Sequence, residues 1–251
     1  MTIQKNTQGE QLIYGRHPVL DALQNGMSVD KVWLAQSTKG GYDRELRQWC
    51  KTRNVPLQVV PKDRLDQVTK KNHQGVLGWL AHIEYQLIED VFPTIYDRGE
   101  VPLLVMLDSI TDVRNMGAIA RSAEAMGAHA LILPHKKTAQ INAEALKTAA
   151  GAFSTLPVCR TASLGNAVDY LLLNGVQIVA ADVRGETALA ALDWTLPTAL
   201  IMGAEDAGVR PHLLRKATAF YIPMGGQTDS LNVSVATGIC LYECRRQRLV
   251  D

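Results

Sequence analysis

Apolar and polar positions alternate in a regular way along the second half of the chain. Short apolar runs predict five strands, at residues 103–107, 130–133, 177–181, 199–202 and 219–222. Apolar positions at helical spacing predict helices at 117–126, 142–149, 164–173, 210–216 and 232–246. Strands separated by helices form mainly parallel sheets, and near-continuous apolar strands are typical of sheets covered on both faces. An α/β fold is therefore expected here.

The first part of the chain predicts a smaller α/β unit of its own. Three strands are expected at 29–35, 57–60 and 75–83, with helices around Pro18 to Gly26, at 42–54 and at 63–69. The following stretch is acidic and is interrupted by Pro93 and Gly99, which favours a linker with one helical piece. The predicted organisation is a domain at 1–83, a linker at 84–101 and a larger domain at 102–251.

Composition limits the class of protein. The chain has 251 residues, of which 47% are apolar, so it can bury a core and is not expected to be disordered. Its longest stretch without a charged residue is thirteen residues, Ser230 to Tyr242, whereas a membrane span needs about 20 apolar residues. The polar N-terminus has no hydrophobic stretch of a secretory signal. A cytoplasmic protein without a membrane partner is expected.

Metal and cofactor motifs are missing from the sequence. The four cysteines lack CxxC spacing and are expected to be buried thiols, and the six histidines lack the spacing of metal ligands. No G-x-G-x-x-G, no P-loop and no G-x-S-x-G pattern is found. These observations predict no bound metal and exclude the commonest nucleotide-binding and serine-hydrolase signatures.

Charge is distributed unevenly along the chain, although the net charge is only +1. Residues 1–85 contain 12 basic and 8 acidic residues, whereas residues 86–251 contain 14 basic and 17 acidic residues. A basic front half is consistent with an anionic partner on that side, although an imbalance of this size also occurs on ordinary protein surfaces.

Three loops that follow predicted strands carry unusual polar and glycine residues. Ligands of open α/β sheets bind beyond the carboxyl ends of the strands, so these loops are candidate sites. In the first loop, Asn115 suits a helix N-cap and Gly117 allows close approach of another backbone segment. Arg121 follows among small apolar residues, which favours a half-buried side chain paired with an anion over a solvated helix residue.

The other two loops follow the strands predicted at 199–202 and 219–222. Gly203, Glu205 and Gly208 allow a tight turn with a carboxylate facing a ligand, or form an ordinary glycine-rich turn. In the third loop, the Pro-Met-Gly-Gly segment at 223–226 leaves backbone groups free to bind a flat base such as adenine. Ser230 and Asn232 cluster at the next helix start, where capping by Ser230 is the simpler interpretation.

The three loops together resemble the SpoU (TrmH-type) RNA 2′-O-methyltransferases of the SPOUT superfamily. The resemblance rests on the order and spacing of N115-x-G117-x-x-x-R121, G203-x-E205-x-x-G208 and I222-P-M-G-G…S230-L-N-V-S-x-A236. In the front half, YGRHPVLDAL at 14–23 and NHQGVLGWL at 72–80 resemble the substrate-binding domain found in many members. The resemblance therefore covers nearly the whole chain.

The resemblance implies a fold and a set of site residues. It implies a C-terminal α/β domain with a deep trefoil knot, a smaller N-terminal α/β/α domain of ribosomal-protein type, and a homodimer whose site is completed across the interface. S-adenosylmethionine would be held by the backbone around Gly203, Ile222, Met224 and Leu231. The implied catalytic cluster consists of Asn115, Arg121, Glu205, Ser230 and Asn232.

The resemblance also implies a reaction and a substrate. The activity would be methyl transfer to a ribose 2′-hydroxyl of RNA without a metal, and the most similar members methylate a guanosine in the peptidyl-transferase region of 23S rRNA. The resemblance implies that Arg121 activates the 2′-hydroxyl. Because a guanidinium hardly gives up its proton, the alternative role of Arg121 is to bind the neighbouring phosphate and stabilise a developing alkoxide. Cations of the front domain would contact RNA phosphates; these are Arg44, Arg47, Lys51, Arg53, Lys62, Arg64, Lys70 and Lys71.

Two alternatives to this substrate and activity stay open. A tRNA or a different rRNA site is compatible with the same motifs. A non-catalytic RNA-binding assembly factor would keep the fold without methyl transfer, although the presence of Arg121 and Glu205 argues against it. A small-molecule α/β enzyme is the interpretation that any one of the three loops alone would favour.

Overall fold

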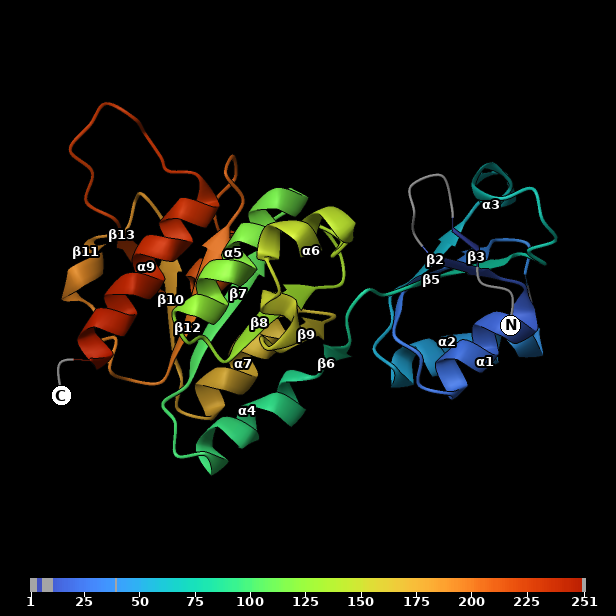
Figure 1. Cartoon of the computed structure of the whole chain (residues 1–251), viewed down its shortest axis with the longest axis horizontal. Coiled ribbons are helices and arrows are strands. Elements are labelled where there is room, and N and C mark those ends of the chain that lie inside the picture. The colour runs from blue at the N-terminus through green and yellow to red at the C-terminus, as the bar shows by residue number, and fades with distance from the viewer. Residues whose placement is uncertain (1–3, 6–10, 39, 250–251) are drawn as a thin grey trace. The chain divides into compact units, whose positions relative to one another are not determined.

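The computed structural model describes residues 4–5, 11–38 and 40–249, and its chain divides into two compact units between Glu84 and Tyr85 (Figure 1). The N-terminal unit contains a mixed sheet in the order β1-β2-β5-β3-β4, in which only β3 and β4 pair in parallel. Its strands are β1 (Gln4–Lys5), β2 (Gln11–Tyr14), β3 (Val29–Ala35), β4 (Leu57–Val60) and β5 (Val76–Leu80). Its helices are α1 (Arg16–Gln24), α2 (Gly41–Thr52) and α3 (Lys62–Val68).

Helices cover both faces of this sheet. On one face, Leu23 of α1 and Leu46 of α2 are fully buried in one apolar cluster. On the other face, Leu65 of α3 is buried with Leu77 and Trp79 of β5. The expected α/β/α arrangement is confirmed, and β3 and β4 have the predicted bounds. The strand β2 was not predicted.

The C-terminal unit contains an eight-stranded sheet whose neighbouring strands all pair in parallel, in the order β11-β13-β10-β12-β7-β8-β9-β6. The strands are β6 (Tyr85–Gln86), β7 (Leu103–Asp108), β8 (Ala130–Pro134), β9 (Val158–Thr161), β10 (Gln177–Ala181), β11 (Thr187–Ala188), β12 (Thr198–Gly203) and β13 (Thr218–Tyr221). Every residue of β7 and β8 is buried, as expected for strands covered on both faces.

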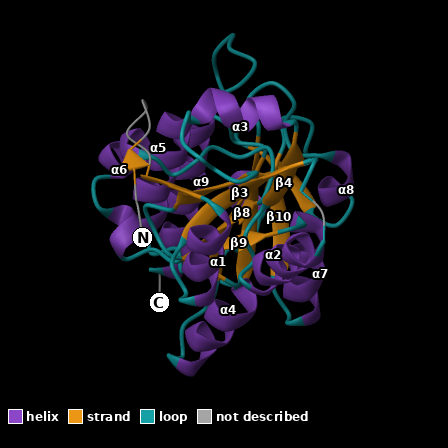
Figure 2. Cartoon of the chain, turned by 90° about the vertical axis from the view of Figure 1, so that its right-hand side faces the viewer, coloured by secondary structure: helices purple, strands orange, loops and turns teal. Residues whose placement is uncertain are grey.

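Two layers of helices cover this sheet (Figures 1 and 2). One layer contains α4, α7 and α8, whose apolar residues share a core with the strands. The other layer contains α5 packed against α6 and α9. The helices are α4 (Ile88–Asp97), α5 (Val113–Ala125), α6 (Ala143–Ala149), α7 (Leu164–Leu173), α8 (Pro211–Leu214) and α9 (Val233–Arg248), with two 3₁₀ turns at Ala152–Ser154 and Leu189–Ala191.

The prediction of a linker at 84–101 is wrong. Residues of β6 pair with β9, and α4 buries Ile88, Val91, Phe92 and Ile95 against the sheet. Those four positions form an apolar stripe at helical spacing, and burying it outweighs the break expected at Pro93, which lies on the exposed side. The segment is therefore part of the C-terminal unit.

Two predicted helix starts also need correction. The carboxylate of Asp112, not the side chain of Asn115, caps α5, because it accepts hydrogen bonds from the backbone N–H groups of Arg114 and Asn115 at 2.6 and 3.3 Å. At α9, Asn232 rather than Ser230 is the cap, and its Oδ1 accepts from the backbone N–H of Ser234 at 2.9 Å. These shifts decide which side chains are free to form a site.

The described residues include no helix long and apolar enough to cross a membrane. All four cysteines are buried free thiols, as expected. No group of three or more metal-ligating side chains occurs within residues 11–38 and 40–249.

Candidate active site

Three side chains from distant parts of the chain meet in one hydrogen-bonded triangle. The Asn232 Nδ2 group donates to Glu205 Oε1 at 2.7 Å and lies 3.0 Å from Asn115 Oδ1. The Asn115 Nδ2 group donates to the same Glu205 oxygen at 3.0 Å. Each of the three predicted loops thus contributes one residue, and three of the five predicted catalytic residues come together.

The topology of the sheet explains this convergence. Strands β7 and β12 are parallel neighbours, and Asp108 at the end of β7 is in register with Gly203 at the end of β12. The order of strands reverses direction between them, and ligand crevices form at such switch points. Asn115 lies in the first turn of α5, which follows β7, and Glu205 lies in the loop after β12. Asn232 is brought to the same place because α9 packs against α5.

Capping fixes the orientation of the Asn232 amide. Its Oδ1 accepts from both the backbone N–H and the hydroxyl of Ser234, at 2.9 and 2.6 Å. The amide nitrogen must then point the other way, towards Glu205 and Asn115. One Glu205 oxygen therefore receives two N–H donors, while its second oxygen makes no hydrogen bond within the described part of the chain.

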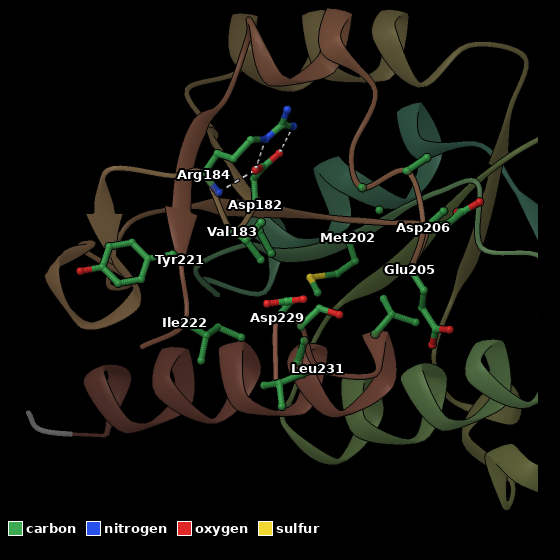
Figure 3. Close-up of a pocket in the computed structure, with 18 of the residues that line it drawn as sticks. Asp182, Val183, Arg184, Met202, Glu205, Asp206, Tyr221, Ile222, Asp229 and Leu231 are labelled. Atoms are coloured by element: carbon green, nitrogen blue, oxygen red, sulfur yellow. Dashed lines mark hydrogen bonds and ion pairs between the residues drawn. The ribbon is translucent and has the colours of Figure 1, made fainter. Parts of the chain in front are cut away.

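A cavity of about 410 Å³ includes Glu205 of the triangle in its lining, and Figure 3 shows this cavity with the residues that line it. All four residues predicted to hold a cofactor line it, namely Gly203, Ile222, Met224 and Leu231. Two of the predicted catalytic residues, Glu205 and Ser230, line it as well. The structure thus gathers the predicted cofactor residues around one hollow that shares Glu205 with the triangle.

The wall of this cavity contains an ion pair that the sequence did not predict. Figure 3 shows that Arg184 donates two side-chain hydrogen bonds to the Asp182 carboxylate. The distances are 2.9 Å from Nε to Oδ1 and 2.8 Å from Nη2 to Oδ2. Hydrogen bonds from Arg184 hold the pKa of Asp182 below its usual value. Asp182 directly follows β10. Because ligands of parallel sheets bind beyond the carboxyl ends of the strands, its position in the sequence could have indicated a site residue.

A second unpredicted pair anchors the loop that carries Glu205. The Asp108 carboxylate is fully buried and accepts from the backbone N–H and Nε of Arg210, at 2.8 and 2.6 Å. The sequence does contain a sign of this pair, because Asp108 is a charged residue at the end of an apolar strand. A buried charge at such a place needs a partner, and the sequence alone does not show which residue supplies it.

Gly117 and Gly203 allow other segments of this chain to pack closely against them. A Cβ atom at Gly117 would lie 2.6 Å from the carbonyl oxygen of Ala145 and 2.7 Å from Thr148 Cβ, so this glycine lets α5 approach α6. A Cβ atom at Gly203 would overlap the backbone of Gly208. Both positions need glycine because neighbouring chain segments occupy the space.

Arg121 does not join the triangle, and the expectation of a half-buried, anion-paired arginine is wrong. Its side chain is exposed, does not line the cavity, and makes no hydrogen bond or ion pair to any residue that the structure describes. The buried face of α5 is formed by Met116, Ile119, Ala120 and Ala123, and Arg121 projects away from it. Small apolar neighbours in sequence thus did not imply a buried arginine.

Comparison with known proteins identifies this arrangement. The SpoU rRNA Methylase family matches residues 102–242, and the family described as RNA 2′-O ribose methyltransferase substrate binding matches residues 12–86. The chain belongs to the SpoU rRNA methylase family. Its two units have the fold class expected from the resemblance, and its activity class is that of an RNA methyltransferase.

Relatives of this SpoU methyltransferase match over nearly the full chain. An uncharacterized tRNA/rRNA methyltransferase, ML0324, of Mycobacterium leprae is 35% identical over 97% of this chain and 80% of its own. Among solved structures, the SpoU methyltransferase AviRb from Streptomyces viridochromogenes in complex with AdoMet has a TM-score of 0.62 and 26% identity, covering 97% of this chain and 92% of its own. An AdoMet-bound rRNA methyltransferase from Sinorhizobium meliloti has a TM-score of 0.60 and 28% identity, covering 94% and 86%.

Proposed function

We propose that this protein transfers a methyl group from S-adenosylmethionine to a ribose 2′-hydroxyl of RNA, and that its target is a guanosine in the peptidyl-transferase region of 23S rRNA. The main observation in support of methyl transfer is the triangle of Asn115, Glu205 and Asn232 beside the cavity. Two solved SpoU relatives are complexes with AdoMet, which supports the same cofactor here.

The residues that line the cavity suit this cofactor chemically. Ile222, Met224 and Leu231 provide apolar surface, and backbone groups of the same loop provide the donors and acceptors that a purine edge needs. The Asp182 carboxylate at the cavity wall offers acceptors for hydroxyl groups such as those of a ribose. When bound, the sulfonium supplies an electrophilic methyl group.

The residues of the site then have to place the 2′-oxygen in line with the methyl–sulfur bond. As the new carbon–oxygen bond forms, the methyl–sulfur bond would break, S-adenosylhomocysteine would leave, and the hydroxyl proton would pass to water. Correct alignment of reactants can contribute about 7–11 kcal/mol to such a reaction. Glu205 holds the two asparagine amides in fixed positions. Ser230 lines the cavity, and its hydroxyl makes no hydrogen bond to any residue that the structure describes, so it can bind the ribose or the cofactor. Arg121 would bind the adjacent phosphate and stabilise negative charge on the attacking oxygen.

We further propose that the active form is a homodimer and that Arg121 reaches the site of the partner copy. Within one chain, Arg121 lies outside the triangle and the cavity. The neighbouring helix α9 exposes three large apolar side chains at helical spacing, Val235 at 52%, Ile239 at 36% and Tyr242 at 60%. An exposed apolar stripe beside an unpaired site residue is consistent with a second copy of the chain covering both.

Methyl transfer tests the proposal directly. Protein and labelled S-adenosylmethionine are incubated with naked 23S rRNA, 16S rRNA and tRNA, and the label is mapped to a nucleotide and to the 2′-oxygen. Label at a 23S rRNA guanosine, absent with Asn232→Ala, is the expected result. Label in tRNA would keep the reaction and overturn the substrate. If neither naked RNA nor ribosomal precursors were labelled, methyl transfer would be overturned in favour of an RNA-binding assembly role.

A further inference from the structure

The two family motifs of the N-terminal unit, far apart in sequence, form one structural element. The backbone N–H of Arg16 donates to Gln74 Oε1 at 3.0 Å, and Arg16 Nε donates to the Gln74 carbonyl at 3.4 Å. The backbone N–H of Gly15 donates to the carbonyl of Val76 at 3.3 Å. The segment before α1 is therefore tied to the segment before β5, and the two loops line one hollow.

This hollow has a volume of about 820 Å³ and a strongly basic lining. Arg16, Lys62, Lys70 and Lys71 line it, and we call these four residues the basic cradle. Asp66 is the single carboxylate among the lining residues. Uncharged polar side chains also line the hollow, contributed by Ser37, Thr38, Asn72 and Gln74, and His17, His73 and Gly75 complete the lining.

The single carboxylate is already engaged by a buried histidine. His73 is only 4% exposed, and its Nε2 lies 2.8 Å from Asp66 Oδ1. Its Nδ1 accepts the backbone N–H of Gly75 at 3.0 Å, so Nε2 carries the proton and donates to Asp66. This hydrogen bond is the main cause of a lowered pKa of Asp66, and the positive charges of Lys62 and Lys70 add to it. The cradle therefore has four cations and only one carboxylate, which is also hydrogen-bonded to His73, so its net charge is positive.

The positive charges of the cradle are not neutralised by ion pairs between its cations and carboxylates of the described residues. Lys62 and Lys70 form no ion pair with any other residue in the described ranges. The guanidinium of Arg16 lies 5.1 Å from the ring centre of Tyr42, and the ammonium of Lys71 lies 5.8 Å from that of Tyr14. Aromatic rings attract cations and orient their side chains, but they do not remove the charge.

Gly75 and Thr38 pack closely against each other in the lining of the cradle. Gly75 has a φ of +81°, and a Cβ atom there would lie 2.5 Å from Thr38 Oγ1. Thr38 is itself only 8% exposed. Position 75 therefore requires glycine, because a larger residue would be strained at this φ and would overlap Thr38.

The other basic surface of this unit is partly used by the fold itself. On α2, Arg47 forms an ion pair with Asp43 at 2.7 Å. Arg53 donates to the carbonyls of Leu23 and Gln24 at 2.8 and 3.0 Å and so covers the end of α1. Only part of the basic set predicted to bind RNA is therefore available on α2, whereas the lysines of the cradle are free to meet an external anion.

We propose that the basic cradle is the site at which the N-terminal unit binds the RNA phosphate backbone. This inference rests on the proposed function, and it assigns RNA contact to the cradle in preference to the surface of α2. Phosphates neutralise the clustered charges, while the neutral polar lining provides donors and acceptors for ribose or base. Phosphate contacts position the substrate without selecting its sequence.

The test compares two triple variants of the full-length chain that remove the same charge. Lys62→Ala/Lys70→Ala/Lys71→Ala removes three of the four cations of the cradle, and Arg44→Ala/Arg47→Ala/Lys51→Ala is the matched control on α2. Affinity for transcribed 23S rRNA is measured by fluorescence anisotropy at several salt concentrations. The cradle variant is expected to bind at least about tenfold more weakly, and its logarithmic salt slope to fall by about two, since each lost phosphate contact removes roughly 0.7–0.9. The control is expected to lose less than about threefold.

Equal losses in the two variants, or a larger loss in the α2 variant, would overturn the proposal. Absence of RNA binding by the unmodified protein would also overturn it. Binding of S-adenosylmethionine, measured by calorimetry, is expected to be unchanged in both variants. A wild-type protein that bound RNA through the cradle but transferred no methyl group would contradict the proposed reaction while leaving the RNA site intact.

Discussion

Arg210 reaches Asp108 across 102 residues of chain and places its Nε 2.6 Å from a carboxylate that is fully buried. Asp108 ends β7, and Arg210 ends the loop that carries Glu205. This ion pair therefore links the loop after β7 to the loop after β12. It is a structural support that neither loop reveals on its own.

Replacing Arg210 with alanine is expected to destabilise the C-terminal unit by about 3 kcal/mol, because the buried Asp108 carboxylate loses its counter-charge and keeps hydrogen bonds only from the backbone N–H of residue 210 and the Ser109 hydroxyl. The free energy of unfolding from urea titrations, followed by near-UV circular dichroism, measures this change. Arg215→Ala is the control, since Arg215 is exposed, and a change below about 0.5 kcal/mol is expected there. Similar losses in the two variants would contradict the role of the Asp108 pair.

Replacing Glu205 with glutamine is expected to lower kcat about 10–100-fold. The glutamine keeps an acceptor oxygen but loses the negative charge, and charge-assisted hydrogen bonds contribute roughly 1.5–3 kcal/mol. The KM for the cofactor should change less than about threefold, because Glu205 orders the amides of Asn115 and Asn232 more than it binds the cofactor. Steady-state methyl transfer measures both constants.

The neighbouring carboxylate offers a control for this substitution. Asp206 also lines the cavity but makes no hydrogen bond within the described residues, and Figure 3 shows it directed away from Glu205. Asp206→Asn should keep nearly normal kcat. If Asp206→Asn and Glu205→Gln lowered kcat equally, the loss would reflect the charge of the loop and not the triangle.

Sequence patterns predicted the repeating elements of the large sheet well. The strand at 177–181 and the helix at 164–173 have the bounds that apolar periodicity predicts. Short strands such as Val158–Thr161 were missed, because a segment containing Arg160 lacks an apolar run. One helical piece was predicted in the segment 84–101, and α4 confirms it, but Pro93 and Gly99 led to its assignment as a linker because a local pattern does not contain the tertiary packing that buries this helix.

The site was predicted in its parts but not in its geometry. Asn115, Glu205 and Asn232 follow different strands, and only their order in the family motifs indicated that they meet. Partners such as Asp108 and Arg210 depend on strand order, which the sequence does not specify locally. The exposure of Arg121 depends on which face of α5 packs inward, and small residues on several faces left that face ambiguous.

The stability of the protein is expected to fall between pH 7 and pH 5 because of His135. Burial, together with the positive charges of Arg160 and Lys136, lowers the pKa of His135 from 6.5 to about 4. Its buried Nε2 makes no hydrogen bond to a described residue. The unfolded chain therefore binds a proton below about pH 6.5, while the folded protein binds it only near pH 4, so acid favours unfolding across this interval.

The His135→Gln variant isolates this effect. The loss of unfolding free energy from pH 7 to pH 5 should be about 1 kcal/mol smaller in the variant than in the wild type, after allowance for partial solvent exposure. His17→Gln, the same substitution at an exposed position, is the matched control. Parallel pH profiles for the wild type and His135→Gln would show that this imidazole is not held neutral by the fold.

Arg121 provides the sharpest test of a site shared between two copies. If Arg121 acts on the partner's site, a chain with Arg121→Ala and a chain with Asn232→Ala are each inactive as homodimers. Mixed dimers would contain one complete site, built from the Asn232 of the first chain and the Arg121 of the second. After unfolding and refolding an equal mixture, about a quarter of wild-type activity should return, because half the dimers are mixed and each has one working site. If Arg121 served its own chain, no mixed dimer would contain a complete site, and the mixture would stay as inactive as its components.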